Sequence, residues 1–259
     1  MAEAALASGS MTLPNGLEIA HLNTAETAVL FREIFTNRCW LPDEVELSAG
    51  DVVVDVGANI GVASLCFDLE AEDLRIFAFE PAPAAFEALE KNLAGCRGTA
   101  TARRVAVGRE RGSRTLLYYP SASVMSSLYA DPVADGELTQ AYLRNSGFST
   151  SAAAKLAEGM HEGIEIQCEV WPLSAVIDEE GIARIDYLKI DVERSELDVL
   201  LGIRDEHWPL IRQVGAEVHD EHGMLAAIRE LLERNGFHVV VRQDPLLRGT
   251  CVHDLFATR

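Results

Sequence analysis

Residues 51–65 read DVVVDVGANIGVASL, and this stretch decides the fold class. The apolar run at 52–56 is typical of a strand that is buried on both faces, as in a parallel sheet covered by helices. Two glycines, Gly57 and Gly61, follow it, and apolar residues then recur at helical spacing over 59–70. A strand, a glycine turn and a helix in this order predict the start of a nucleotide-binding α/β fold.

The turn also indicates which kind of nucleotide binds. A dinucleotide fingerprint, G-x-G-x-x-G, needs its second glycine so that a pyrophosphate can approach the backbone. Here Asn59 and Val62 stand at the second and third glycine positions, which leaves D-x-G-x-x-x-G with Asp55, Gly57 and Gly61. Asp55 would repel a phosphate and attract a cation, so S-adenosylmethionine, with its cationic amino and sulfonium groups, is favoured over NAD. The alternative is that both glycines merely allow close helix–strand packing.

A second acidic residue supports a nucleoside cofactor. Glu80 ends the next apolar run, 74–80, which is where doubly wound folds place an acid that binds ribose hydroxyls. NAD and S-adenosylmethionine share those hydroxyls, so Glu80 does not discriminate between them. Ala58 in the turn and Pro81 after the second strand complete the candidate cofactor-binding set in this region.

Composition bounds the class of protein. The 259 residues, 48% hydrophobic and 24% charged, fit one fairly large globular domain. A formal net charge of −19 argues against a nucleic-acid substrate and against anionic membranes. Five cysteines without a C-x-x-C pair fit a reduced, cytoplasmic protein. No apolar run approaches the roughly 20 residues of a membrane span, and residues 1–10 lack the features of a signal peptide, so we expect a short, loose N-terminus.

The chain is expected to contain two parts. Residues 1–50 form an N-terminal extension that packs on the core, with a hairpin turning at Asn15-Gly16 and then a helix. Asn23 caps that helix, and Glu26 occupies the capping-box position. Residues 51–259 form the main domain.

Within the main domain, strand and helix patterns alternate. Expected strands cover 52–56, 74–80, 101–108, 185–192, 211–219, 238–243 and 251–259, and expected helices cover 59–70, 83–95, 195–202 and 223–237. This alternation predicts an open, doubly wound α/β sheet. It breaks between 109 and 172, where extra strands at 113–120 and 164–173 flank a small, polar and weakly helical segment, 131–163. A segment of this length is usually a functional lid or a disordered loop.

Several of these segments carry a family resemblance. They are REIF (32–35), VVDVGANIG (53–61), FEPAPAAFEALEKN (79–92), VAVG (105–108), SSL (126–128), IDYLKIDVERSELDVLLG (185–202) and EVH (217–219). Through them the chain resembles the FkbM family of S-adenosylmethionine-dependent methyltransferases from about residue 12 to residue 242.

The resemblance implies a seven-stranded class I methyltransferase (Rossmann-like) sheet with helices on both faces. It also implies an O-methyltransferase that acts on a hydroxyl or, in some members, a carboxyl group, with Ser126 and Ser127 bordering the cofactor. The family usually reads K-I-D-V-E-G, whereas this chain has Arg194 in place of the glycine. We expect that departure to reshape the turn beside the acceptor.

Two strand ends carry the candidate catalytic residues. Asp191, followed by Glu193, ends one expected strand at the crevice where open α/β sheets bind ligands. Asp191 is therefore a candidate to bind the methionine amino group, orient the acceptor or ligate a metal, unless it merely caps the helix near Ser195. Glu217 and His219 end the neighbouring strand.

Methyl transfer to an alcohol needs alignment of the acceptor and removal of a proton. We expect His219 to be the general base, with Glu217 orienting it or joining Asp191 around Mg²⁺. Trp40 is a candidate to stack on a ring, and His161 and His222 are weaker candidates near the acceptor.

These observations predict an O-methyltransferase that acts on a small hydroxylated molecule, plausibly a polyketide, macrolide or sugar of secondary metabolism. A non-catalytic protein that holds S-adenosylmethionine on the same fold is the alternative. Asn59 disfavours an NAD-dependent oxidoreductase, and a homodimer remains an open alternative to a monomer.

Overall fold

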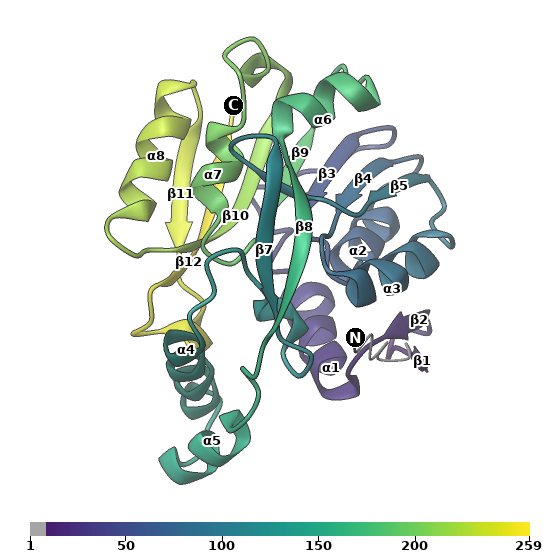
Figure 1. Cartoon of the computed structure of the whole chain (residues 1–259). Coiled ribbons are helices and arrows are strands. Elements are labelled where there is room, and N and C mark those ends of the chain that lie inside the picture. Colours follow the sequence, from purple (N-terminus) through teal and green to yellow (C-terminus); the bar gives the residue numbers. More distant parts are fainter. Residues whose placement is uncertain (1–8) are drawn as a thin grey trace.

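A seven-stranded sheet lies at the centre of the computed structural model, which describes residues 9–259 (Figure 1). Its strands, in spatial order, are β11 (His238–Arg242), β12 (Val252–Thr258), β10 (Gln213–His219), β9 (Tyr187–Ile190), β3 (Val52–Val56), β4 (Arg75–Phe79) and β5 (Thr99–Arg103). The five strands from β10 to β5 run parallel, and β12 lies antiparallel between β10 and β11. The predicted doubly wound, mostly parallel sheet is therefore confirmed.

Helices cover both faces of this sheet. One face carries α2 (Val62–Glu70) and α3 (Pro83–Leu93), and the other carries α6 (Leu173–Glu180), α7 (Glu196–Leu201) and α8 (Met224–Arg234). All five residues of β3 are buried, because alternate side chains enter alternate layers. Among residues 9–259, no helix is long and apolar enough to cross a membrane.

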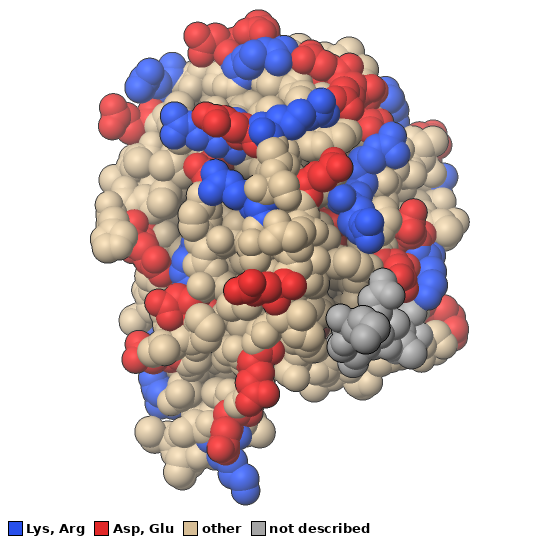
Figure 2. Space-filling model, viewed as in Figure 1, with Lys and Arg blue, Asp and Glu red and all other residues tan. Residues whose placement is uncertain are grey.

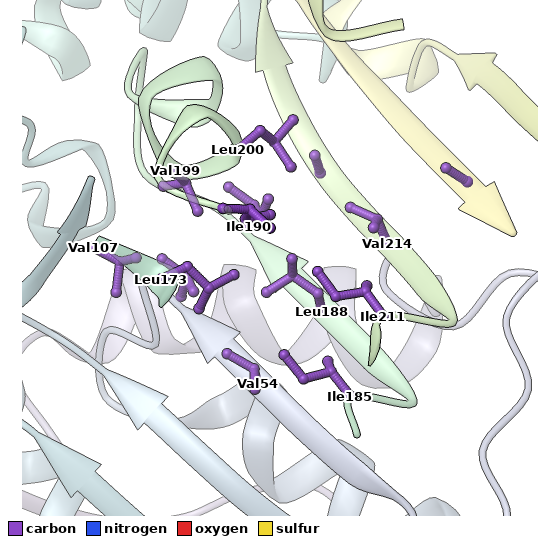
Figure 3. Close-up of a cluster of buried hydrophobic side chains, with 14 of the residues drawn as sticks. Val54, Val107, Leu173, Ile185, Leu188, Ile190, Val199, Leu200, Ile211 and Val214 are labelled. Carbon is purple, nitrogen blue, oxygen red and sulfur yellow. The ribbon is translucent and has the colours of Figure 1, made fainter. Parts of the chain in front are cut away.

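Figure 3 shows the core layer under α6 and α7, where Val54, Leu188 and Ile190 of the sheet meet Leu173 and Val199 of the helices. Burial of each such side chain contributes about 1.5–3 kcal/mol. On the face seen in Figure 2, Lys and Arg side chains lie interspersed with acids, mostly above the middle of the view.

The N-terminal segment contains the predicted hairpin and helix. Strands β1 (Gly9–Thr12) and β2 (Glu18–His21) pair antiparallel, and Gly16 in the turn has φ +88°. Most of the expected loose N-terminus, residues 1–8, lies outside the described residues. Helix α1 (Thr24–Phe31) is capped by Asn23, as predicted, and continues into the short π-helix η1 (Arg32–Thr36). The division of the chain at residue 50 stays a prediction.

Glu26 does not complete a capping box. Its carboxylate accepts hydrogen bonds from Ser123 Oγ at 2.8 Å and from the Val124 amide at 3.1 Å. The prediction for Glu26 is therefore wrong, because a distant segment supplies better donors than its own helix end.

The expected strand at 101–108 is two strands in two sheets. β5 ends at Arg103, and β6 (Ala106–Gly108) pairs instead with β8 (Ile164–Pro172), which also pairs with β7 (Gly112–Tyr118). The chain leaves the central sheet because Val105 and Val107 turn into the buried cluster that contains α6.

The segment 131–163 is more helical than its composition suggested. It contains α4 (Pro132–Asn145) and α5 (Thr150–Ala157), whose N-termini are capped by Asp131 and Ser149. Figure 1 shows both helices projecting below the central sheet, on the side away from α6. Asn145 Nδ2 donates to the carbonyl oxygen of Leu246, 2.8 Å away, in the short helix η4 (Pro245–Leu247).

Candidate active site

A cavity of about 660 Å³ lies between the carboxyl ends of the central strands and the α4–α5 segment. The strand ends contribute Gly57, Ala58, Asn59, Glu80, Pro81, Asp191, Glu193 and Glu217 to its lining. The α4–α5 segment contributes Leu138, Thr139, Tyr142, Leu143, Leu156 and Met160. Strand β3 is the switch point of the sheet, because its successors along the chain lie on both sides of it, and this is where open α/β sheets bind ligands.

The glycine turn and Glu80 form one end of the cavity. The amides of Asn59 and Ala82 donate to the two carboxylate oxygens of Glu80 at 2.9 and 2.8 Å. Burial raises the pKa of Glu80 to about 7, although these two backbone bonds oppose the shift. The buried carboxylate lines the cavity and has lone pairs left to accept ribose hydroxyls. The residues at this end therefore fit the adenosyl part of S-adenosylmethionine.

The two glycines of the turn have different reasons to be glycine. A Cβ on Gly57, which has φ +76°, would lie 1.7 Å from the carbonyl oxygen of Asp191, so the backbones of β3 and β9 touch there. A Cβ on Gly61 would lie 2.7 Å from Leu89 Cδ1. Gly61 has φ +86° and is absent from the cavity lining, so its left-handed backbone and close packing, the alternative left open by the sequence, account for it.

Asp55 lies beneath the turn and does not line the cavity. Its Oδ1 is 3.0 Å from Lys189 Nζ, and its Oδ2 accepts from Ser64 Oγ at 2.6 Å. The prediction that Asp55 faces the cationic end of the cofactor is wrong, because Lys189 already neutralises it. A lysine in the middle of a buried strand, as in LKID, signals a buried carboxylate partner, and sequence reasoning missed this signal.

Lys189 organises the strand ends around it. Its side chain is 2% exposed. The ammonium Nζ donates to the carbonyl oxygen of Gly57 at 2.7 Å and lies 3.3 Å from Asp191 Oδ2. Burial alone would lower the pKa of Lys189, but Asp55 and Asp191 outweigh it and raise the pKa. The ammonium therefore stays charged and ties β9 to β3.

Carboxylates form the floor of the cavity. Burial raises the pKa of Asp191 to about 6, although Lys189 opposes the shift. The pKa of Glu217 is raised well above its ordinary value by burial and by the negative charges of Asp191 and Glu193. Asp254, paired with Glu217 across β10 and β12, has a pKa raised to about 7, chiefly by burial. Carboxyl groups with a pKa of about 6 or 7, as in Asp191 and Asp254, exchange a proton near neutral pH.

Asp191 does not cap a helix. Its carboxylate pairs with Lys189, and Ser195 stands at the N-cap of α7 without a side-chain hydrogen bond. The structural alternative for Asp191 therefore does not apply.

His219 lies behind this floor, outside the cavity lining. The imidazole is 1% exposed, with Nε2 3.1 Å from Glu193 Oε2 and Nδ1 3.3 Å from Glu196 Oε1. Burial alone would lower the pKa of His219, but the two carboxylates raise it well above its ordinary value. An imidazolium that faces a carboxylate at each ring nitrogen has no free nitrogen to take a proton, which argues against the predicted general base. His219 instead positions Glu193.

One group of residues has metal-ligand spacing. Glu193, Glu217 and His219 offer ligand atoms that all lie within 4.8 Å of one another. Both ring nitrogens of His219 already face carboxylates, those of Glu193 and Glu196.

The remaining sequence candidates divide into two groups. Ser126, Ser127 and Trp40 line the cavity, whereas His161 and His222 do not. Trp40 is 7% exposed, and its ring centroid lies 5.1 Å from Lys189 Nζ.

Tyr142 and Glu33 were not identified from the sequence. The Tyr142 hydroxyl donates to Glu33 Oε1 at 2.7 Å and accepts from Arg32 Nη2 at 2.6 Å. Glu33 lies in the REIF segment and also lines the cavity. The bond between Tyr142 and Glu33 joins α4 to the N-terminal segment, and the two residues are 109 positions apart in the chain.

Comparison with known proteins now assigns the family. The sequence matches the methyltransferase FkbM domain over residues 55–239. This chain belongs to the FkbM methyltransferase family. It is 46% identical over 251 residues to the 31-O-demethyl-FK506 methyltransferase FkbM of Streptomyces tacrolimicus, and the match covers 96% of each chain. It is also 32% identical over 228 residues to methyltransferase sdnD of Sordaria araneosa, a match that covers 84% of this chain and 85% of the relative.

A solved structure supports the fold of this FkbM-family methyltransferase. Methyltransferase FkbM from Methylobacillus flagellatus superposes with a TM-score of 0.51 at 15% identity, covering 82% of this chain and 44% of the other. The resemblance drawn from the motifs is therefore confirmed, as is the class I methyltransferase fold. That fold implies S-adenosylmethionine as the methyl donor, and the turn with Glu80 fits it.

Proposed function

We propose that this FkbM-family methyltransferase transfers the methyl group of S-adenosylmethionine to a hydroxyl oxygen of a small molecule of secondary metabolism, of polyketide, macrolide or sugar type. The observation that carries the proposal is that one cavity is lined by Gly57 and Glu80 at one end and by the carboxylates of Asp191 and Glu217 on its floor. The name of the Streptomyces tacrolimicus relative, which specifies an O-demethylated substrate, also supports it.

When bound, S-adenosylmethionine supplies an electrophilic methyl group on a sulfonium. Glu80 would accept the ribose hydroxyls, and the close approach of Gly57 to the Asp191 carbonyl oxygen places Asp191 beside the glycine turn. The carboxylate of Asp191 takes the hydroxyl proton as the new C–O bond forms, and the electron pair of the broken C–S bond stays on sulfur. A base in this position contributes on the order of 10² to 10⁴-fold in rate.

Asp191 is the favoured base for two reasons. With a pKa of about 6, it is ionised at neutral pH and still basic enough to take a proton. For Glu217, burial and the negative charges of Asp191 and Glu193 raise the pKa and favour the protonated form, which would donate a hydrogen bond to the acceptor.

The walls of the cavity indicate the kind of acceptor. Leu138, Leu143, Leu156 and Met160 of the α4–α5 segment stand opposite the carboxylate floor. Apolar surface buried against them stabilises a complex by about 25 cal/mol per Å², whereas the floor accepts hydroxyl donors. We therefore infer a largely apolar acceptor that presents a hydroxyl group, and the α4–α5 segment acts as its lid.

The proposal is tested by calorimetry with S-adenosylhomocysteine and by a mass-spectrometric screen of hydroxylated polyketides and sugars for a gain of one methyl. We expect saturable binding and a methylated product that disappears in Asp191→Asn. Binding without any product would favour the non-catalytic alternative, and absence of binding would reject both. Parallel reactions with Mg²⁺ and with a chelator test the further suggestion of a cation at Asp191 and Glu217. Turnover that survives chelation would reject the cation.

A further inference from the structure

Arg194 occupies a backbone position that suits glycine. It has φ +73°, and the preceding Glu193 has φ +50°. Side chains other than glycine are disfavoured in this left-handed region. The side-chain contacts of Arg194 must therefore supply enough stabilisation to offset the strain of its backbone conformation.

Those contacts are two ion pairs, and the Arg194 side chain that makes them is buried. The Arg194 side chain is 7% exposed, with Nη1 2.6 Å from Asp135 Oδ1 and Nε 2.8 Å from Glu221 Oε1. Asp135 is fully buried in α4, and its other oxygen accepts from the Tyr119 hydroxyl at 2.7 Å. The guanidinium thus bridges the turn after β9, the turn after β10 and helix α4.

The contact with Asp135 orients one face of α4. Residues three and four apart lie on the same side of a helix, so Asp135, Leu138, Thr139 and Tyr142 share a face. Leu138, Thr139 and Tyr142 line the cavity. The turn that carries Arg194 also carries Glu193 of the cavity floor.

We propose that Arg194 is a specificity-determining positioning residue, which holds α4 against the strand ends and so sets the shape of the acceptor wall. The placement of α4 by Arg194 does not depend on the reaction. Only the consequence for the acceptor rests on the proposed function.

Hydrogen exchange measured by mass spectrometry on the full chain tests the placement. In Arg194→Gly, which suits the backbone but removes the side chain, we expect peptides of α4 to exchange at least tenfold faster than in the wild type. Peptides from 52–80 should be unchanged, and the Kd for S-adenosylhomocysteine should stay within twofold. Arg204→Ala is the matched control, because Arg204 also pairs with two acids, Asp178 and Glu206, at an exposed site away from the cavity.

A second variant keeps the test decisive if Arg194→Gly folds poorly. Arg194→Gly combined with Asp135→Asn also removes the orphaned buried carboxylate, and we expect α4 to remain fast-exchanging in a folded protein. Wild-type protection of α4 in this double variant would overturn the proposal. Faster exchange that extends through 52–80 together with weaker cofactor binding would also overturn it, since that indicates a general structural role.

The acceptor identified by the methylation screen gives a kinetic readout. For Arg194→Gly we expect KM for that acceptor to rise about tenfold while kcat changes less than threefold, with partial recovery in Arg194→Lys. An unchanged KM would reject the role in specificity. If no acceptor is methylated at all, the proposed function fails while the exchange experiment still decides the placement of α4.

Discussion

Two walls of the cavity are built differently. The strand-end wall comes from β3, β4, β9 and β10, whose positions follow from backbone ladders, and Lys189 adds buried ion pairs to Asp55 and Asp191. The wall from α4 and α5 joins the rest of the protein through side chains, at Asp135, Tyr142 and Asn145 among others. We infer that the first wall fixes the cofactor and the second is free to change with the acceptor.

The difference has an energetic basis. Each ladder bond in a sheet is cooperative with its neighbours, so a single side-chain change rarely moves a central strand. A helix held by a few side-chain contacts shifts when one of them is lost. The following predictions test this contrast, from the largest expected effect to the smallest.

Lys189→Met should cost the most stability. It leaves Asp55 buried without its counter-charge, which typically costs about 3–5 kcal/mol in the free energy of unfolding. Urea denaturation measures the loss. Arg229→Met is the control, because Arg229 forms an exposed pair with Glu233 on α8, and we expect about 0.5 kcal/mol or less there. Equal losses in the two variants would show that buried charge does not hold the strand-end wall.

Asp191→Asn should reduce kcat by about 100-fold or more, because the amide cannot take up the acceptor proton. Glu217→Gln should reduce it less than about tenfold, because burial and its negative neighbours raise the pKa of Glu217 and favour the protonated form, and an amide donates a hydrogen bond as that form does. Single-turnover kinetics with saturating cofactor separates the two. The reverse order of effects would transfer the role of base to Glu217.

Cofactor affinity should fall at low pH through Glu80. Its pKa in the folded protein is raised to about 7, and ribose hydroxyls donate to the ionised form, so affinity is full above pH 7 and is lost as pH falls through that value. We expect the Kd for S-adenosylhomocysteine to be about tenfold weaker at pH 6 than at pH 8. Calorimetry at both values checks this. The same pH dependence in Glu80→Gln would assign it to another group.

Tyr142→Phe should have the smallest effect. It removes the hydrogen bond to Glu33 and the one from Arg32, which together are worth about 1–2 kcal/mol, and leaves the cofactor end untouched. Thermal unfolding and calorimetry with S-adenosylhomocysteine are the measurements. A change in cofactor affinity would mean that the two walls are coupled and would contradict the contrast drawn above.

Sequence patterns predicted most of the fold. Buried apolar runs such as 52–56 and amphipathic segments such as 223–237 depend on periods of 2 and 3.6 residues, which are local properties. The strand expected at 101–108 failed because no local signal marks the point where Val105 leaves one sheet for another layer. The helices in 131–163 were underestimated, because part of their stability comes from contacts such as Asn145 with Leu246.

The candidate site was predicted only in part. Gly57, Glu80, Asp191 and Glu217 line the cavity as expected, because the carboxyl ends of parallel strands meet at one edge. The residue types of Asp55 and His219 suggested chemistry, but neither side chain lines the cavity. Their counter-charges come from strands and turns that are distant in the sequence.

By itself the sequence determined the fold class and the family, because the glycine turn and the motifs around it carry that information locally. Only the tertiary structure decided which acids reach the cavity, that Lys189 neutralises Asp55, and that Arg194 reaches α4. These depend on burial and on contacts between residues far apart in the chain, such as Asp135 and Arg194, 59 residues apart. Electrostatic pairing inside a protein depends on such proximity and on exclusion of water, and neither property is local in the sequence.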